Sequence, residues 1–91
     1  MVSFGSRSER ENFRNPHQQY AVLVLHNDEV NTFDHVIDAL CDVCEHTREQ
    51  AEQCALITHL CGQCEIKKGE RNDLVILSTQ LQDLALTVTI Q

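Results

Sequence analysis

The sequence predicts an α+β sandwich in which a small, three-stranded, mostly antiparallel sheet packs against three helices. Two observations indicate strands: a short apolar run rich in β-branched residues at 20–25, and an alternation of apolar residues with threonine at 86–90. Between them, apolar residues recur at the i, i+3, i+4 spacing of amphipathic helices. A chain of 91 residues has room for one small domain with a single core.

The first 18 residues are predicted to form a flexible N-terminal extension, and residues 19–91 the folded domain. In the extension, polar and charged residues are interleaved, and the sizeable apolar groups after Met1 are Val2, Phe4 and Phe13. Burying so little apolar surface does not offset the conformational entropy that is lost on ordering.

The folded domain begins with a predicted buried strand at 20–25, and a helix follows the polar turn after it. Thr32 is placed to cap that helix. We expect the helix to end near Glu45 and His46, because a new capping box starts at Thr47. The apolar positions that keep the helical spacing are Phe33, Val36, Ile37, Leu40, Val43 and Cys44.

A second helix is predicted from the capping box Thr47 to Gln50 as far as Gly62, which offers a left-handed stop. Several residues of its apolar stripe are small, so the two helices are expected to approach closely. The stripe consists of Ala51, Cys54, Ala55, Ile57, Thr58 and Cys61.

Three further elements are predicted beyond Gly62. Residues 64–67 alternate as a strand, and residues 68–70 form a turn. Asn72 opens a third helix, whose apolar side consists of Leu74, Leu77, Leu81 and Leu84. In the final strand, two threonines face water and the opposite face carries Leu86, Val88 and Ile90.

Composition argues against several classes of function. The net charge is -7, and nucleic-acid affinity depends on cationic contacts with phosphates, so no nucleic-acid partner is expected. No apolar run approaches the roughly 20 residues of a membrane span, and the first five residues lack the apolar part of a secretion signal. We therefore expect a cytoplasmic protein that binds no membrane, with its five cysteines reduced. The three glycines are scattered and form no phosphate-binding loop, and no cofactor is predicted.

The polar chemistry of the chain is concentrated in Asn27-Asp28-Glu29, between the first strand and the first helix. These residues offer carboxylate and amide oxygens with no basic residue among them. Such a set of acceptors suits a cation that carries several N–H donors. The alternative interpretation is that Asn27 and Asp28 only form the turn and cap the helix.

The cysteines provide a rival hypothesis. Cys41-x-x-Cys44 and Cys61-x-x-Cys64, with sixteen residues between the two pairs, fit the pattern of a tetrahedral zinc site in a zinc-stabilised interaction module. Cys41 and Cys44 fall inside a periodic helix, however, where Cys44 already belongs to the apolar stripe. Cysteine packs readily as a small hydrophobic residue, so core packing is favoured over zinc binding.

His59 lies near the C-terminal end of the second predicted helix. A lone helical histidine is usually a surface or core residue, and His17, His26 and His46 do not form an i, i+4 metal pair with it. We find no Ser-His-Asp or Cys-His arrangement typical of nucleophilic catalysis, so this class of catalysis is not predicted.

Four segments together carry a family resemblance: Tyr20-x-Val22 through Leu25, Asn27-Asp28-Glu29, Phe33-Asp34-x-Val36-Ile37-x-x-Leu40, and Ala51 to His59 with Gly62. Over about residues 20–66 the chain resembles the ClpS family, the adaptors of the ATP-dependent Clp protease. The resemblance implies a small α/β sandwich with a mobile N-terminal extension and no catalytic activity. Members of this family bind protein substrates through a bulky hydrophobic N-terminal residue (an N-degron beginning with Leu, Phe, Tyr or Trp). They deliver these substrates to a Clp AAA+ unfoldase of the ClpA or ClpC type.

The resemblance also implies a binding site. Asn27, Asp28 and His59 would accept hydrogen bonds from the α-amino group of the substrate. A hydrophobic pocket for the first side chain would be lined by Asn31, Phe33, Ala55, Thr58 and Leu86. Phe33 stands where members usually have Met or an aliphatic residue, and Ala55 and Thr58 where they often have Met and Val. The preferred first residue is therefore left open.

Overall fold

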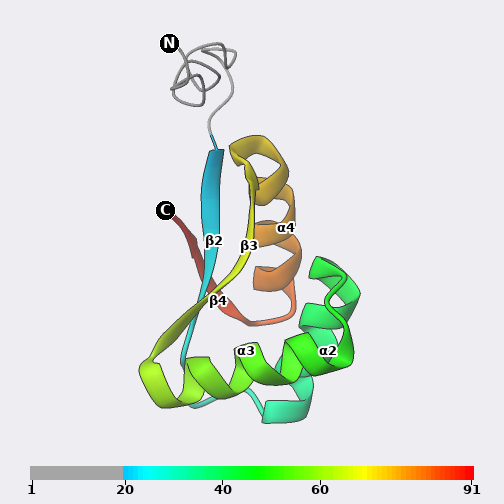
Figure 1. Cartoon of the computed structure of the whole chain (residues 1–91), viewed down its shortest axis with the longest axis vertical. Coiled ribbons are helices and arrows are strands. Elements are labelled where there is room, and N and C mark those ends of the chain that lie inside the picture. Colours follow the sequence, from blue (N-terminus) through cyan, green and yellow to red (C-terminus); the bar gives the residue numbers. More distant parts are fainter. Residues whose placement is uncertain (1–19) are drawn as a thin grey trace, which may run out of the picture.

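The computed structural model describes residues 20–91, which form three strands and three helices (Figure 1). In chain order these elements are β2 (Tyr20–His26), α2 (Phe33–Cys44), α3 (Arg48–Cys61), β3 (Gln63–Glu70), α4 (Arg71–Asp83) and β4 (Thr87–Ile90). The flexible extension predicted at residues 1–18 lies outside the described residues. Within residues 20–91, no helix is long and apolar enough to cross a membrane.

The three strands form one antiparallel sheet in the order β3-β2-β4, so the first strand of the domain lies in its centre. β3 pairs with β2 over its whole length, from Tyr20 opposite Glu70 to His26 opposite Gln63. β4 is shorter and pairs with the second half of β2. α4 contacts all three strands, and α2 and α3 pack together near the end of the sheet where β2 finishes (Figure 1). This architecture confirms the predicted α+β sandwich.

Threonine side chains cap the N-termini of α2 and α3. Thr32 accepts a hydrogen bond from the N–H of His35, and Thr47 accepts one from the N–H of Gln50, each at 3.1 Å. Each bond satisfies a donor in the first helical turn that has no partner within the helix. Gly62 ends α3 with a φ of 95°, a left-handed conformation that glycine adopts without steric penalty. These helix ends are where the sequence predicted them.

The turn predicted at residues 68–70 is wrong, because β3 continues through these residues as far as Glu70. They pair with the first half of β2, and this pairing with a long central strand outweighs the local turn signal. The third helix also begins one residue earlier than predicted, at Arg71. The Glu70 side chain caps it, accepting a hydrogen bond from the N–H of Asn72 at 2.9 Å.

The core lies between the sheet and the helices. Leu23 of β2, Leu40 of α2 and Leu81 of α4 are completely inaccessible to solvent. His46, in the turn between α2 and α3, is also buried, and its Nε2 lies 2.8 Å from the carbonyl oxygen of Ile66 in β3. This contact fixes the interhelical turn, and with it both helices, against the sheet.

Glu45 ends α2 with a φ of 60°, a left-handed conformation that costs a residue with a Cβ about 1 kcal/mol or more. Replacing Glu45 with glycine is expected to raise the free energy of unfolding by about 0.5–1 kcal/mol, and the Tm by about 2–8 °C. Thermal unfolding followed by circular dichroism measures this change. Gln53→Gly, at an exposed position inside α3, is the matched control and should lower the Tm. A Tm for Glu45→Gly at or below that of the unmodified protein would contradict the prediction.

Candidate functional site

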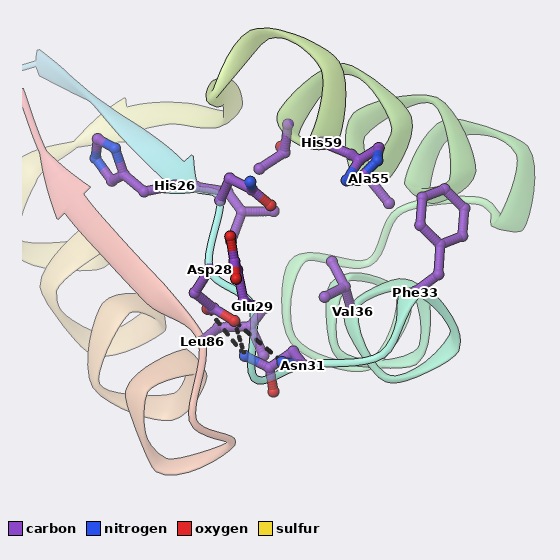
Figure 2. A pocket seen from close by; sticks show the side chains of 12 residues that line it. His26, Asp28, Glu29, Asn31, Phe33, Val36, Ala55, His59 and Leu86 are labelled. Carbon is purple, nitrogen blue, oxygen red and sulfur yellow. Dashed lines mark hydrogen bonds between the residues drawn. The ribbon is translucent and has the colours of Figure 1, made fainter.

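A pocket opens between the turn that follows β2, the start of α2 and one face of α3 (Figure 2). Its volume of about 390 Å³ is within the range of sites that hold small ligands. All eight residues that the sequence analysis singled out line it: Asn27, Asp28, Asn31, Phe33, Ala55, Thr58, His59 and Leu86. The lining is completed by Leu25, His26, Glu29 and Val36.

The inner wall of the pocket is buried and apolar. Ala55, Thr58 and Leu86 are each at most 5% exposed. The Thr58 hydroxyl donates a hydrogen bond to the carbonyl oxygen of Cys54 at 2.7 Å, so its polar group is satisfied within α3. This wall therefore suits an apolar group, and its small side chains on α3 leave room for a bulky one.

The rim of the pocket is exposed and more polar. Asn27 and Glu29 come from the turn after β2, and His59 from the last turn of α3. Phe33, the first residue of α2, is 45% exposed, which places it at the mouth of the pocket and outside the core. In Figure 2, the rings of His59 and Phe33 lie across the pocket from Asp28 and Glu29.

A backbone hydrogen bond holds the turn against α3. The N–H of Asn27 donates to the carbonyl oxygen of Gly62 at 2.9 Å. The N–H of Gly62 in turn donates to the carbonyl oxygen of Thr58, also at 2.9 Å, and so ends α3. These bonds hold Asn27 at the end of α3, and Asn27 and His59 line the same pocket although they are far apart in the sequence.

The carboxylate of Asp28 is used inside the turn. Its Oδ1 accepts hydrogen bonds from the backbone N–H groups of Val30 and Asn31, both at 3.0 Å. Its Oδ2 accepts from the side-chain amide of Asn31 at 3.0 Å and from the Thr87 hydroxyl at 3.3 Å. Burial raises the pKa of this carboxyl group, but the hydrogen bonds outweigh burial and hold the pKa below its ordinary value. Figure 2 shows this carboxylate directed toward Asn31, so Asp28 shapes the turn.

Glu29 differs from Asp28 in having an uncommitted carboxylate. It is exposed, lines the pocket, and makes no hydrogen bond or ion pair with any other residue of 20–91. Sequence reasoning included Glu29 in the acidic turn but did not assign it to the site. Two adjacent carboxylates look alike in a sequence, and the difference appears only once the hydrogen bonds within the turn are known. Among the residues that the structure describes, the pocket lining holds these two carboxylates and no Lys or Arg.

The four cysteines of the zinc hypothesis are not gathered at one point. Cys44 is buried in α2, Cys61 is exposed at the end of α3, and Cys41 and Cys64 are half-buried. Residues 20–91 contain no group of three or more His, Cys, Asp or Glu side chains placed to hold a metal ion. Burial, together with the neighbouring thiol of Cys54, raises the pKa of Cys64 to about 12.

Removing divalent metal is therefore expected to leave the stability of the protein unchanged. Treatment with EDTA should shift the Tm by less than about 1 °C, because residues 20–91 form no site at which a bound metal ion would add to the folding energy. Differential scanning fluorimetry of the EDTA-treated and zinc-supplemented protein provides the measurement. A Tm that falls with EDTA and recovers with zinc would support the zinc-stabilised module built on Cys41, Cys44, Cys61 and Cys64.

Fold and pocket together describe a small α+β domain with an open site of ligand size, polar at its rim and apolar at its inner wall. The model of the family described as ATP-dependent Clp protease adaptor protein ClpS matches residues 15–89. The chain therefore belongs to the ClpS family of Clp protease adaptors, as the sequence resemblance indicated.

The fold is also found among solved structures. One of them is ClpS2 of Agrobacterium tumefaciens, whose structure is described as bound to L-phenylalaninamide. It superposes with a TM-score of 0.69 at 16% sequence identity, and the match covers 80% of the present chain and 95% of that chain. A comparison with curated proteins finds no match.

Proposed function

We propose that the pocket binds the N-terminal residue of a protein substrate, and that the protein acts as an adaptor without catalysing a reaction itself. The observation that carries the proposal is the combination of acceptor groups on the rim with an apolar inner wall in one pocket. An N-terminal residue has the same two parts, since a charged α-amino group and a side chain leave the same carbon atom.

The rim suits the α-amino group. An α-ammonium has three N–H donors, and charge-assisted hydrogen bonds are about twice as strong as neutral ones. We assign three acceptors to them: the side-chain oxygen of Asn27, the carboxylate of Glu29 and a neutral ring nitrogen of His59. Asp28 contributes a nearby negative charge and holds the turn in shape through its bonds to Val30 and Asn31.

The inner wall suits a bulky apolar side chain. Ala55, Thr58 and Leu86 form the buried part of the wall, and Phe33 lies at the mouth. Full burial of a Leu or Phe side chain contributes about 1.5–3 kcal/mol relative to exposure. Leu, Phe, Tyr and Trp are therefore the proposed first residues. The family relative described as bound to L-phenylalaninamide supports this proposal, because that ligand combines a free α-amino group with an aromatic side chain.

Membership of a Clp protease adaptor family supports the second half of the proposal. The protein would bring substrates that carry such an N-degron to a Clp AAA+ unfoldase of the ClpA or ClpC type. The unfoldase, not the adaptor, would supply the energy for unfolding.

A set of peptides that differ only in their first residue tests the proposed function. Fluorescence anisotropy or calorimetry with the full-length protein should give the lowest Kd for peptides that begin with Leu, Phe, Tyr or Trp. Peptides that begin with Gly, Ser or Asp should bind at least about tenfold more weakly, since burial of an apolar side chain is lost. Equal affinities across the set would overturn the proposal.

Filling the inner wall should close the pocket to large first residues. Ala55→Leu adds three carbon atoms at a position that is 4% exposed, and overpacking of this kind costs about 1–3 kcal/mol. We expect the affinity for peptides that begin with Phe, Tyr or Trp to fall by roughly 5- to 150-fold. Gln53→Leu, at an exposed position of the same helix, is the control and should bind like the unmodified protein. If both variants bind aromatic first residues equally well, Ala55 does not line the binding site.

A further inference from the structure

Hydrogen bonds connect the acidic turn to the turn between α4 and β4, which lies beside it. The side-chain nitrogen Nδ2 of Asn31 donates to both carboxylate oxygens of Asp28, at 3.1 and 3.0 Å, and to the carbonyl oxygen of Ala85 at 2.8 Å. The hydroxyl of Thr87 donates to the Oδ2 of Asp28 at 3.3 Å. Both residues that flank Leu86 in the chain are thus hydrogen-bonded to the acidic turn.

Leu86 is a wall residue of the pocket and is only 4% exposed. The residue before it, Ala85, has a φ of 71°, a left-handed conformation that is unfavourable for a residue with a Cβ. Such a conformation persists only where its surroundings hold it. The bond from Asn31 to the Ala85 carbonyl oxygen is one such restraint, and it acts on the peptide unit that leads directly into Leu86.

The N–H donors of the Asn31 side chain have little capacity left for a ligand. An Asn side chain offers two N–H donors, and here the acceptors are Asp28 on one side and Ala85 on the other. In Figure 2 the Asn31 side chain sits below the pocket against Asp28, away from His59 and Phe33 on the opposite rim. Its contacts join two parts of the site to each other.

We propose that Asn31 is a positioning residue, which sets the place of Leu86 relative to the acidic turn and thereby determines which first side chain the pocket accepts. The inference rests on the proposed function of the pocket. In this proposal the turn holds the α-amino group, and Leu86 is part of the wall around the first side chain. Asn31 sets the distance between the turn and Leu86. A rigid aromatic ring depends more on a fixed wall than a flexible leucine side chain, so loss of this restraint penalises Phe more than Leu.

The test compares Asn31→Ala with a matched control, His35→Ala. His35 also bonds the α4–β4 turn, with its Nε2 2.7 Å from the carbonyl oxygen of Leu84, but it does not line the pocket. Kd values are measured for two peptides that differ only in beginning with Phe or Leu. In Asn31→Ala the Phe peptide should lose at least about fivefold more affinity than the Leu peptide, whereas in His35→Ala the ratio should change less than about twofold. Equal losses for both peptides in Asn31→Ala would show a purely structural role and overturn the proposal.

A measurement without ligand separates this inference from the proposed function. In methyl-labelled protein, Asn31→Ala should shift the NMR resonances of the Leu86 methyl groups more than those of Leu74, a core residue of α4 that is 1% exposed. If Asn31→Ala does not fold, Thr87→Val is used in its place. This nearly isosteric variant removes only the bond from the Thr87 hydroxyl to Asp28, and it should also shift the Leu86 methyl resonances. Unmoved Leu86 resonances would overturn the positioning role. If the unmodified protein binds no free-amine peptide while Leu86 shifts as expected, the proposed function fails and the structural connection stands.

Discussion

A peptide that begins with phenylalanine is expected to lose roughly 30- to 1000-fold in affinity when its α-amino group is acetylated. Acetylation removes the positive charge and leaves a single N–H, so the acceptors on the rim lose charge-assisted bonds. Hydrogen bonds to a charged group contribute about 1.5–3 kcal/mol each, and a net loss of about 2–4 kcal/mol corresponds to this range. Calorimetry with the free and acetylated forms of one peptide provides the measurement.

Glu29→Gln tests the same interaction from the protein side. The variant keeps an oxygen acceptor but removes the charge, and binding should weaken by roughly tenfold. Glu49→Gln is the matched control, because Glu49 is exposed on α3 and does not line the pocket. Equal affinity for the free and acetylated peptides would exclude recognition of the α-amino group. If Glu29→Gln binds the free peptide as tightly as the unmodified protein does, the negative charge that binds the α-amino group comes from Asp28.

The family resemblance in the sequence singled out eight residues that line one pocket, but it did not separate their roles. The apolar patterns of period two and 3.6 predict which face of a strand or helix is buried. Ala55, Thr58 and Leu86 were therefore expected on inward faces, and they are buried there. The two adjacent carboxylates of the turn could not be separated in this way. Which one faces solvent depends on the hydrogen bonds that Asp28 makes with Val30 and Asn31 inside the turn, and on one with Thr87 near the other end of the chain.

The errors in the predicted fold also arise from contacts between residues that are distant in the sequence. Gly69 with its charged neighbours predicted a turn, because local propensity was the only information available there. In the structure these residues form the end of β3, and their backbone groups pair with β2. The paired CxxC pattern shows the same limitation, since Cys44 lies in the core of the domain and Cys61 on its surface. Spacing along the chain did not reveal that separation.

Asp28→Ala is expected to reduce both stability and binding, because one carboxylate organises the whole turn. The variant removes the acceptor for the backbone N–H groups of Val30 and Asn31 and for the Thr87 hydroxyl. We expect a loss of about 1–3 kcal/mol in the free energy of unfolding, as for other removed hydrogen-bond partners. Affinity for a Phe-first peptide should fall by at least about tenfold, since Asn27 and Glu29 lose their fixed positions.

The pH dependence of this loss distinguishes the carboxylate from a mere packing effect. Partial burial raises the pKa of Asp28, but its hydrogen bonds with Asn31, Val30 and Thr87 prevail, and the pKa in the folded protein lies below that in the unfolded chain. The stabilisation by Asp28 is therefore fully present above the pKa of an unfolded Asp, about 3.9, and is lost as the pH falls through the lower folded value. The Tm difference between the unmodified protein and Asp28→Ala should be constant from about pH 7 to pH 5 and shrink below about pH 4. Urea unfolding at each pH gives the same comparison as a free energy.

A stability difference between the two proteins that stays the same down to about pH 2.5 would contradict the prediction. The ionised carboxylate would then not hold the turn, and the missing side-chain volume would account for the loss.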